Sequence, residues 1–227
     1  MIRSVSAGLL AACFLAGSVA CGPGAAPALA APASFDCTKA HNATERAICA
    51  DAGLSARDLE IAGTIAGLLR RLDLVTAKIL REDQAAFLAD RNDQQGDRAG
   101  LATSLAARSA FLAALDPAPR ADFAGDWANA RGRLVVRRGD AGSWTVEIDA
   151  RDPGGLWTCR FTGTAKAGRP DLAAESRETA VGWTVRIVRK AGALQVSVEV
   201  PDGGKPGAPF PACTERGSVA GGYLPVK

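Results

Sequence analysis

FDCTKAHNATERAICAD, residues 35–51, contains two cysteines and the only histidine of this 227-residue chain. Cys37 and Cys49 lie twelve positions apart, with His41 between them. Such residues can build a metal site, a reactive thiol centre or a structural disulfide. Which of the three forms depends on the redox compartment in which the chain folds, and the N-terminal sequence indicates that compartment.

Residues 1–30 have the three-part pattern of a secretory signal peptide. Arg3 precedes an apolar run from about Val5 to Ala20, and the small residues that follow end in Ala28-Leu29-Ala30. This ending predicts cleavage before residue 31. The apolar run is too short to span a bilayer. We therefore expect an exported protein.

A lipid anchor is the alternative to soluble export. Residues 18–21, Ser-Val-Ala-Cys, resemble a weak lipobox, and residues 10–13 form a better match very near the N-terminus. The Gly-, Ala- and Pro-rich residues after Cys21 are suited to a flexible tether. Both alternatives place the folded part in the periplasm, in the cell envelope or outside the cell.

Four cysteines follow the predicted cleavage site: Cys37, Cys49, Cys159 and Cys213. An even number of cysteines in an exported chain predicts disulfide bonds. A structural zinc site needs four Cys or His ligands, and a redox pair usually has Cys-x-x-Cys spacing. Neither pattern is present, so we expect no metal site and no reactive thiol.

The sequence contains no set of residues that indicates an enzyme. His41 is the only candidate base for a Ser-His-Asp or Cys-His centre, and it lies between two cysteines that we expect to be oxidised. Phosphate-binding glycine motifs are missing. The formal net charge of +3 is not concentrated in the way that nucleic-acid binding requires. We expect no catalytic residue, no cofactor and no nucleic-acid partner.

The character of the sequence changes at residues 115–123, where two prolines follow an alanine-rich segment. Before this point, periodic apolar residues predict four helices. The first begins at Asn42 or Thr44 and ends at Cys49, the second has Ser55 as its N-cap, and the others cover about 75–90 and 98–115. Short connections predict antiparallel neighbours in a small bundle.

These helices present a predicted core face. We interpret Gly63 and Gly67, inside the second helix, as points of close helix packing. The core residues that we expect are Leu59, Ala62, Ala66, Leu69, Ile79, Leu80, Phe87, Leu101, Leu105, Phe111 and Leu115.

The second part of the chain alternates apolar and polar residues, which is typical of strands. The strong segments are RLVVRR, SWTVEID, LWTCRFTGTA, GWTVRIVR and ALQVSVEV, and weaker ones begin at Gly125, Asp171 and Gly217. Seven or eight antiparallel strands predict a small barrel or sandwich. The four tryptophans of this part belong either to its core or to a ligand pocket.

The predicted fold is therefore α+β with two domains. A helical domain covers residues 31–116, a linker covers 117–121, and an antiparallel β domain covers 122–227.

Two segments of the helical part carry a family signature. FDCTKAHNATERAICADAGLSARDLE, residues 35–60, and LREDQAAFLADRND, residues 80–93, resemble the LprI-like lysozyme inhibitor family over residues 35–115. Members are exported helical modules, and some inhibit lysozyme. The β part is similar to the C-terminal extension of some members.

The resemblance has implications for the cysteines. Members usually have a further pair at the places that hold Gln94 and Gly100 here. The joint loss of that pair implies that Cys37 pairs with Cys49, which leaves Cys159 to pair with Cys213. On the chain-entropy estimate, these disulfides contribute about 3 and about 4 kcal/mol.

Two functions follow as hypotheses. The first is a protein-binding protein that covers the cleft of lysozyme, with Glu45, Asp51 and Asp58 as candidate contacts to the partner. Each of these carboxylates has an alternative role as a cap or helix-start charge. The second is an envelope protein that binds an apolar ligand in a tryptophan-containing barrel.

Overall fold

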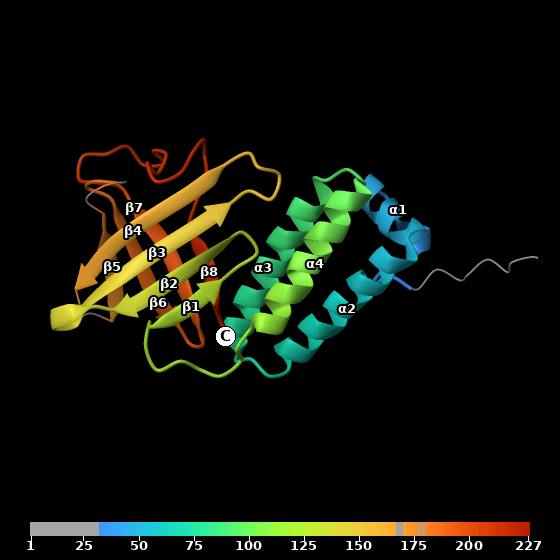
Figure 1. Cartoon of the computed structure of the whole chain (residues 1–227), viewed down its shortest axis with the longest axis horizontal. Helices are drawn as coiled ribbons and strands as arrows, with labels where there is room; N and C mark the ends of the chain where they lie inside the picture. The colour runs from blue at the N-terminus through green and yellow to red at the C-terminus, as the bar shows by residue number, and fades with distance from the viewer. Residues whose placement is uncertain (1–31, 167–169, 177, 179) are drawn as a thin grey trace, which may run out of the picture.

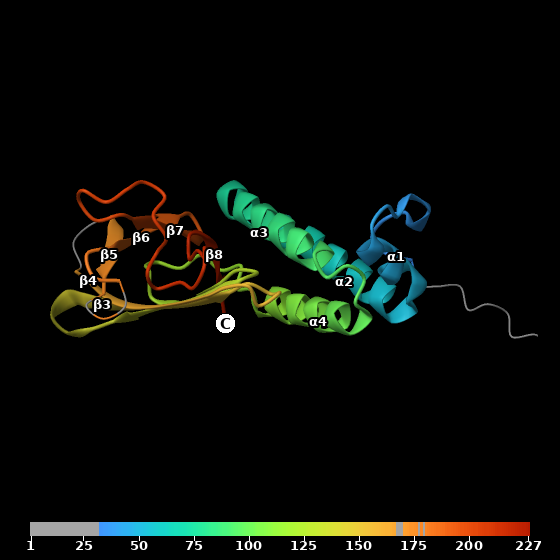
Figure 2. The ribbon, with the colours of Figure 1, turned by 90° about the horizontal axis from the view of Figure 1, so that it is seen from above.

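The computed structural model describes residues 32–166, 170–176, 178 and 180–227. The predicted signal peptide and the lipobox cysteine Cys21 lie outside the described residues. Four helices lead into an eight-stranded antiparallel barrel (Figure 1), and the helices all lie on one side of the barrel (Figure 2). None of the described helices is both long and apolar enough to cross a membrane.

The helical part consists of η1 (Cys37–Lys39), α1 (Ala43–Ala50), α2 (Ala52–Leu69), α3 (Leu74–Asn92) and α4 (Arg98–Ala114). Each α-helix begins after an Asn or Asp whose side-chain oxygen accepts hydrogen bonds from backbone N–H groups of the first turn. These N-caps are Asn42, Asp51, Asp73 and Asp97. The four predicted helices are therefore present, and their starts have a common physical cause.

The predicted start of α2 was wrong. Asp51 is the N-cap, and Ser55 lies buried inside the helix, where its hydroxyl donates to the Ile48 carbonyl at 2.7 Å. The predicted core face was wrong as well, because Leu59 is 44% exposed. The buried face carries Leu54, Ser55, Asp58, Ile61 and Leu68. The error has a clear reason: two polar residues occupy the interior stripe and hide its apolar periodicity.

The interpretation of Gly63 and Gly67 as points of close packing was also wrong. A Cβ atom added at Gly63 would have no neighbour within 4 Å, and one at Gly67 would meet only an Arg70 nitrogen at 3.9 Å. The core residues predicted for α3 and α4 are mostly confirmed. Ile79, Leu80, Phe87, Leu101 and Leu105 are all buried.

The barrel strands are β1 (Gly125–Ala128), β2 (Gly132–Arg138), β3 (Ser143–Arg151), β4 (Thr158–Lys166), β5 (Asp171–Glu175), β6 (Thr184–Lys190), β7 (Ala193–Glu199) and β8 (Gly221–Val226). A short 3₁₀ helix, η2 (Asp140–Gly142), connects β2 to β3. Each strand pairs with its neighbours in chain order, and β1 also pairs with β8. This closure decides between the two predicted architectures in favour of a barrel.

Side chains fill the barrel interior. Trp127, Phe161 and Tyr223 are among the largest fully buried residues of the described chain. Trp127 donates its indole N–H to the Phe123 carbonyl at 2.9 Å, and Tyr223 donates its hydroxyl to the Val219 carbonyl at 3.0 Å. Trp144 is buried as well. An eight-stranded barrel is just wide enough for side chains to fill it, and here Trp127 and Trp144 are part of that filling.

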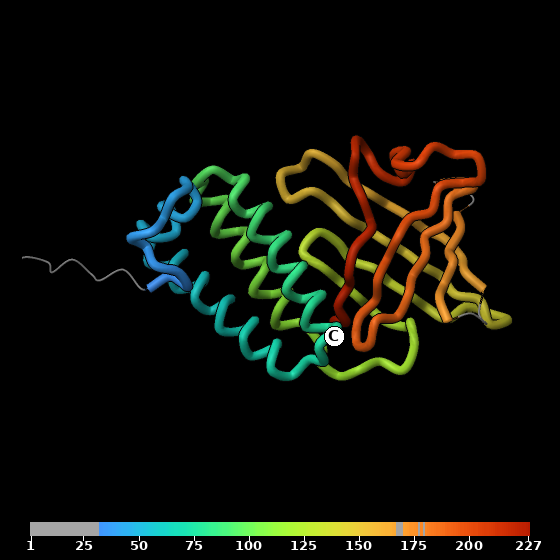
Figure 3. The backbone as a smooth tube through the Cα atoms, turned by 180° about the vertical axis from the view of Figure 1, so that it is seen from behind, coloured from blue at the N-terminus to red at the C-terminus, as the bar shows by residue number. Residues whose placement is uncertain are grey.

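The helices and the barrel share apolar core. Ala193 of β7 and Leu224 of β8 belong to the same buried cluster as the helical leucines. The strand β8 runs beside α3 (Figure 3). Their approach is close, because a Cβ on Gly222 would lie 2.4 Å from Cγ2 of Ile79.

The predicted linker is fixed at both of its ends. Asp116 donates its backbone N–H to the Pro225 carbonyl at 2.9 Å. Further along, the Arg189 guanidinium donates to the carbonyls of Arg120 and Ala121, each at 2.7 Å. These bonds hold the connecting segment against the barrel.

Candidate functional site

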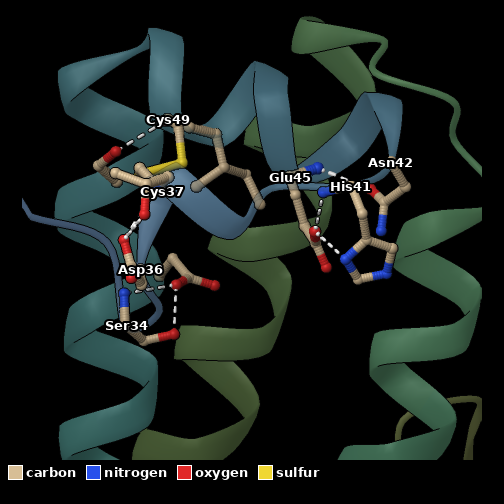
Figure 4. The surroundings of a disulfide bond; sticks show 11 residues. Ser34, Asp36, Cys37, His41, Asn42, Glu45 and Cys49 are labelled. Atoms are coloured by element: carbon tan, nitrogen blue, oxygen red, sulfur yellow. Dashed lines mark hydrogen bonds and ion pairs between the residues drawn. A yellow bond between two sulfur atoms is a disulfide. The ribbon is translucent and has the colours of Figure 1, made fainter.

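The segment that contains His41 is held by a disulfide. Cys37 and Cys49 are bonded, with Cα atoms 5.7 Å apart, and the bond joins η1 to the end of α1 (Figure 4). Cys159 and Cys213 form the second disulfide. Both predicted pairings are therefore confirmed.

His41 lies in a local contact with Glu45 (Figure 4). Its Nδ1 atom is 3.0 Å from Oε2 of Glu45, and its backbone N–H donates to the same oxygen at 2.9 Å. That backbone bond is the main reason why the pKa of Glu45 lies below its usual value. The imidazole is largely exposed. Among the described residues there is no group of three or more His, Cys, Asp or Glu side chains that could hold a metal ion.

The other two candidate contact residues have separate local roles. Asp51 caps α2, and the N–H of Leu54, followed by the side chain of Arg98, lowers its pKa. Asp58 is 5% exposed and forms an ion pair with Arg91 at 2.8 Å. The structure thus does not bring Glu45, Asp51 and Asp58 together on one surface.

The two sequence segments on which the family resemblance rests, residues 35–60 and 80–93, meet in space. The Asp58–Arg91 ion pair joins them inside the protein, and the Thr44 hydroxyl approaches the Asn92 carbonyl at 3.3 Å. These signature residues therefore hold helices together. Because both side chains of this ion pair are buried, they fix how the helices pack and are not available to a partner.

Gln94 and Gly100, where the resemblance implies a further cysteine pair, are also neighbours. A Cβ atom on Gly100 would lie 3.0 Å from Oε1 of Gln94 and 2.6 Å from Oδ2 of Asp97. The glycine leaves room for Asp97 to cap α4, because its own N–H donates to that carboxylate at 3.0 Å.

A cleft of about 770 Å³ lies between α4 and the barrel. We call it the junction cleft. Both views show the tip of the β3–β4 hairpin close to α4 (Figures 1 and 2). The wall formed by α4 includes Gly100, Thr103, Ser104, Ala107 and Phe111. The wall formed by the barrel includes Asn129, Ala130, Asp152, Pro153 and Gly155. Its volume is in the range of ligand sites.

A buried ion pair lies at the base of the junction cleft. Nη1 of Arg108 is 2.6 Å from Oδ2 of Asp83, and both side chains are almost completely buried. The second oxygen of Asp83 accepts the N–H of Ala130, in the β1–β2 turn, at 2.6 Å. The guanidinium lies 5.1 Å from the ring centroid of Phe87 and 4.9 Å from that of Phe111. Asp83 thus joins α3, α4 and the barrel.

Two polar atoms at the junction cleft have no partner among the described residues. They are Nη2 of Arg108, a donor, and Oε1 of Gln94, an acceptor. Both residues line the cleft. Both atoms are shielded from solvent although their residues line the cleft, so a ligand in the cleft does not reach them without a rearrangement of these side chains.

Two further hollows lie on the barrel. One, of about 670 Å³, lies at the end of the barrel beside Trp183 and Phe210. The other is a depression on the outer face of β2, β3 and β4, where Arg133 and Arg160 are already paired with carboxylates. Unlike the junction cleft, neither hollow is lined by a residue that has a buried polar atom without a hydrogen-bond partner in the described part of the chain.

Sequence reasoning missed Asp83 and Arg108. One signal could have identified the arginine: it follows Leu101 and Leu105 at the helical spacing of a core stripe, and Leu112 continues that stripe. A charged residue on an apolar stripe indicates a buried partner.

Comparison of the chain with protein-family models, curated proteins and solved structures finds no match.

Proposed function

We propose that this is an exported, non-enzymatic protein that binds another protein, with lysozyme as the partner implied by the family resemblance. Its helices form a disulfide-held bundle domain, and the barrel forms a second domain. Occlusion is the mechanism: a rigid surface covers the hydrolase cleft and excludes its substrate.

The observation that best supports this proposal is the contact between the two signature segments. The Asp58–Arg91 pair lies between them, and the Cys37–Cys49 disulfide lies at the edge of the first. Residues quoted for the resemblance thus have a shared structural purpose, which favours common ancestry of the helical module. Two disulfides favour folding in an oxidising compartment.

Protein binding is also favoured by the rigidity of the molecule. The helices and the barrel share buried residues, and a preorganised surface loses little conformational entropy when it binds. The partner surface is expected outside the signature residues, because Asp58 is buried and Asp51 is occupied by its cap and by Arg98.

The test is a muramidase assay with the purified, disulfide-intact protein. We expect the rate of cell-wall lysis by lysozyme to fall as the protein is added, and to reach a plateau at stoichiometric excess. Unchanged lysis rates at micromolar excess would overturn lysozyme as the partner.

Ligand binding by the barrel is the second candidate. The hollow beside Trp183 and Phe210 favours it, whereas the filled interior around Phe161 and Trp127 does not. Titration with lipids and sterols, followed by tryptophan fluorescence, tests it. A saturable change in emission supports a ligand site near Trp183, and an unchanged spectrum contradicts it.

A further inference from the structure

We propose that the outer face of the barrel binds a phosphate group, carried either by a soluble molecule or by a lipid headgroup. The site is the depression of about 710 Å³ on β2, β3 and β4. We call it the arginine depression, because Arg131, Arg133, Arg151 and Arg160 line it, whereas Asp149 is the only acidic residue among its described lining residues. This inference goes beyond the binding of a protein partner and does not depend on it.

The strand register brings the four arginines together. Arg133, Asp149 and Arg160 are paired in one row across β2, β3 and β4. The next row on the same face contains Arg151, whose N–H donates to the carbonyl of Arg131 at 2.9 Å. All five side chains are exposed. Arg151 therefore lies opposite Arg131 and has the other two arginines as diagonal neighbours, which long side chains can reach.

Arg151 has no counter-ion in the described part of the chain. The next residue, Asp152, lines the junction cleft instead, and its carboxylate accepts the N–H of Leu156 at 3.1 Å. Arg131 is already held by two hydrogen bonds to Asp90, at 2.9 and 2.6 Å. Like charges opposite each other on a sheet are destabilising. An unpaired guanidinium among three others therefore favours an anionic ligand.

The remaining two arginines can turn part of their hydrogen-bonding capacity toward such a ligand. Arg160 and its partner Asp149 are 85% and 67% exposed, and an exposed pair of this kind is easily exchanged. Arg133 shares Asp126 with Arg137, so one carboxylate serves two guanidinium groups. Each guanidinium has five N–H donors. Donors of both residues thus remain for an anion in the depression.

Phosphate suits this arrangement better than a carboxylate does. The two oxygens of a carboxylate are occupied by a single guanidinium fork. A phosphate group has more acceptor oxygens and up to two negative charges, so it can bind the forks of Arg133, Arg151 and Arg160 together. The volume of the depression also leaves room for the glycerol or sugar that carries the phosphate, and the exposed Thr158 lies at its edge.

The test measures the binding of two probes to the purified, disulfide-intact protein at low ionic strength. Pyrophosphate, followed by titration calorimetry, represents a soluble phosphate. Vesicles of phosphatidylglycerol, compared with vesicles of phosphatidylcholine, represent a lipid headgroup. Arg151→Gln removes the unpaired guanidinium. Its matched control is Arg57→Gln, which removes the same charge from an exposed position of α2 outside the depression.

We expect Arg151→Gln to weaken binding by about tenfold, the effect of lost hydrogen bonds between charged groups, and Arg57→Gln to leave it unchanged. Asp149→Asn should tighten binding several-fold, because it removes the carboxylate that competes for Arg160. Arg151→Gln should leave the melting temperature unchanged or raise it, since a like-charged neighbour is lost. A purely structural role of Arg151 would lower the melting temperature and leave binding unaffected.

The pattern of binding identifies the source of the phosphate. Binding to phosphatidylglycerol but not to phosphatidylcholine, lost in Arg151→Gln, assigns the site to a lipid headgroup, and pyrophosphate binding without vesicle binding assigns it to a soluble molecule. The inference is overturned if neither probe binds, or if the wild type and Arg151→Gln bind equally. Equal weakening by Arg57→Gln would overturn it too, because the effect would then be one of net charge. None of these results depends on lysozyme inhibition.

Discussion

Removal of the negative charge at Asp83 should unfold this protein at much lower denaturant concentration. The side chains of Asp83 and Arg108 are 4% and 1% exposed. Asp83→Asn keeps the volume and an oxygen for the Ala130 N–H, but it leaves the arginine as a buried charge without a counter-ion. Breaking a buried pair in this way costs about 3–5 kcal/mol.

The matched control is Asp90→Asn, about two turns further along α3. Asp90, whose side chain is 10% exposed, is paired with Arg131, whose side chain is 42% exposed and remains hydrated without its partner. Loss of a pair whose remaining cation stays hydrated costs about 1 kcal/mol. The predicted difference between the two Asn variants is therefore at least about 2 kcal/mol, although each removes one carboxylate from the same helix.

Urea unfolding, followed by two signals, measures this difference. All four tryptophans lie in the barrel sequence, whereas circular dichroism at 222 nm reports mainly the helices. With a slope of about 2 kcal/mol per molar urea, a loss of 4 kcal/mol lowers the midpoint by about 2 M. Both signals should shift together, because the helices and the barrel share a core. Equal midpoints for Asp83→Asn and Asp90→Asn would refute the reasoning.

Three further predictions concern stability. Gly63→Ala should raise the free energy of unfolding by about 1 kcal/mol, because the added methyl group meets no atom and glycine is a poor helix former; Gly222→Ala, which would strike Ile79, should lower it in the same urea experiment. The double variant Cys37→Ser with Cys49→Ser should lose about 3 kcal/mol in thermal unfolding under oxidising conditions, and an unchanged melting temperature would contradict a stabilising disulfide. Stability should also fall in acid. The carboxylates with lowered pKa values, Asp51 among them, contribute fully above about pH 4 and lose this contribution as pH falls through their folded-state values, which a series of melts from pH 6 to pH 2 will show.

Much of the fold was predictable because its signals are local. Eight alternating segments became eight strands, and an Asn at position 42 became the cap of α1 because its side chain accepts the Glu45 N–H at 2.8 Å. The closure of the sheet into a barrel was not predictable, since β1 and β8 pair across almost a hundred residues and no local pattern records such a pairing.

The candidate site was predictable only in part. Both disulfides follow from cysteine number and family resemblance, but the junction cleft has walls from α4 and from the β3–β4 loop. Its position depends on how Asp83 joins α3, α4 and the β1–β2 turn. The sequence shows Asp83 as one acidic residue among 24, so its role appears only when its partners are placed in space.

The most direct test of the account is amide hydrogen exchange of the intact protein with and without lysozyme. We predict that lysozyme slows exchange over a surface of the protein outside residues 36–51, because Asp58 is buried and Asp51 is occupied by its cap and by Arg98. Exchange that is the same with and without lysozyme, or slowed only in residues 36–51, would contradict it.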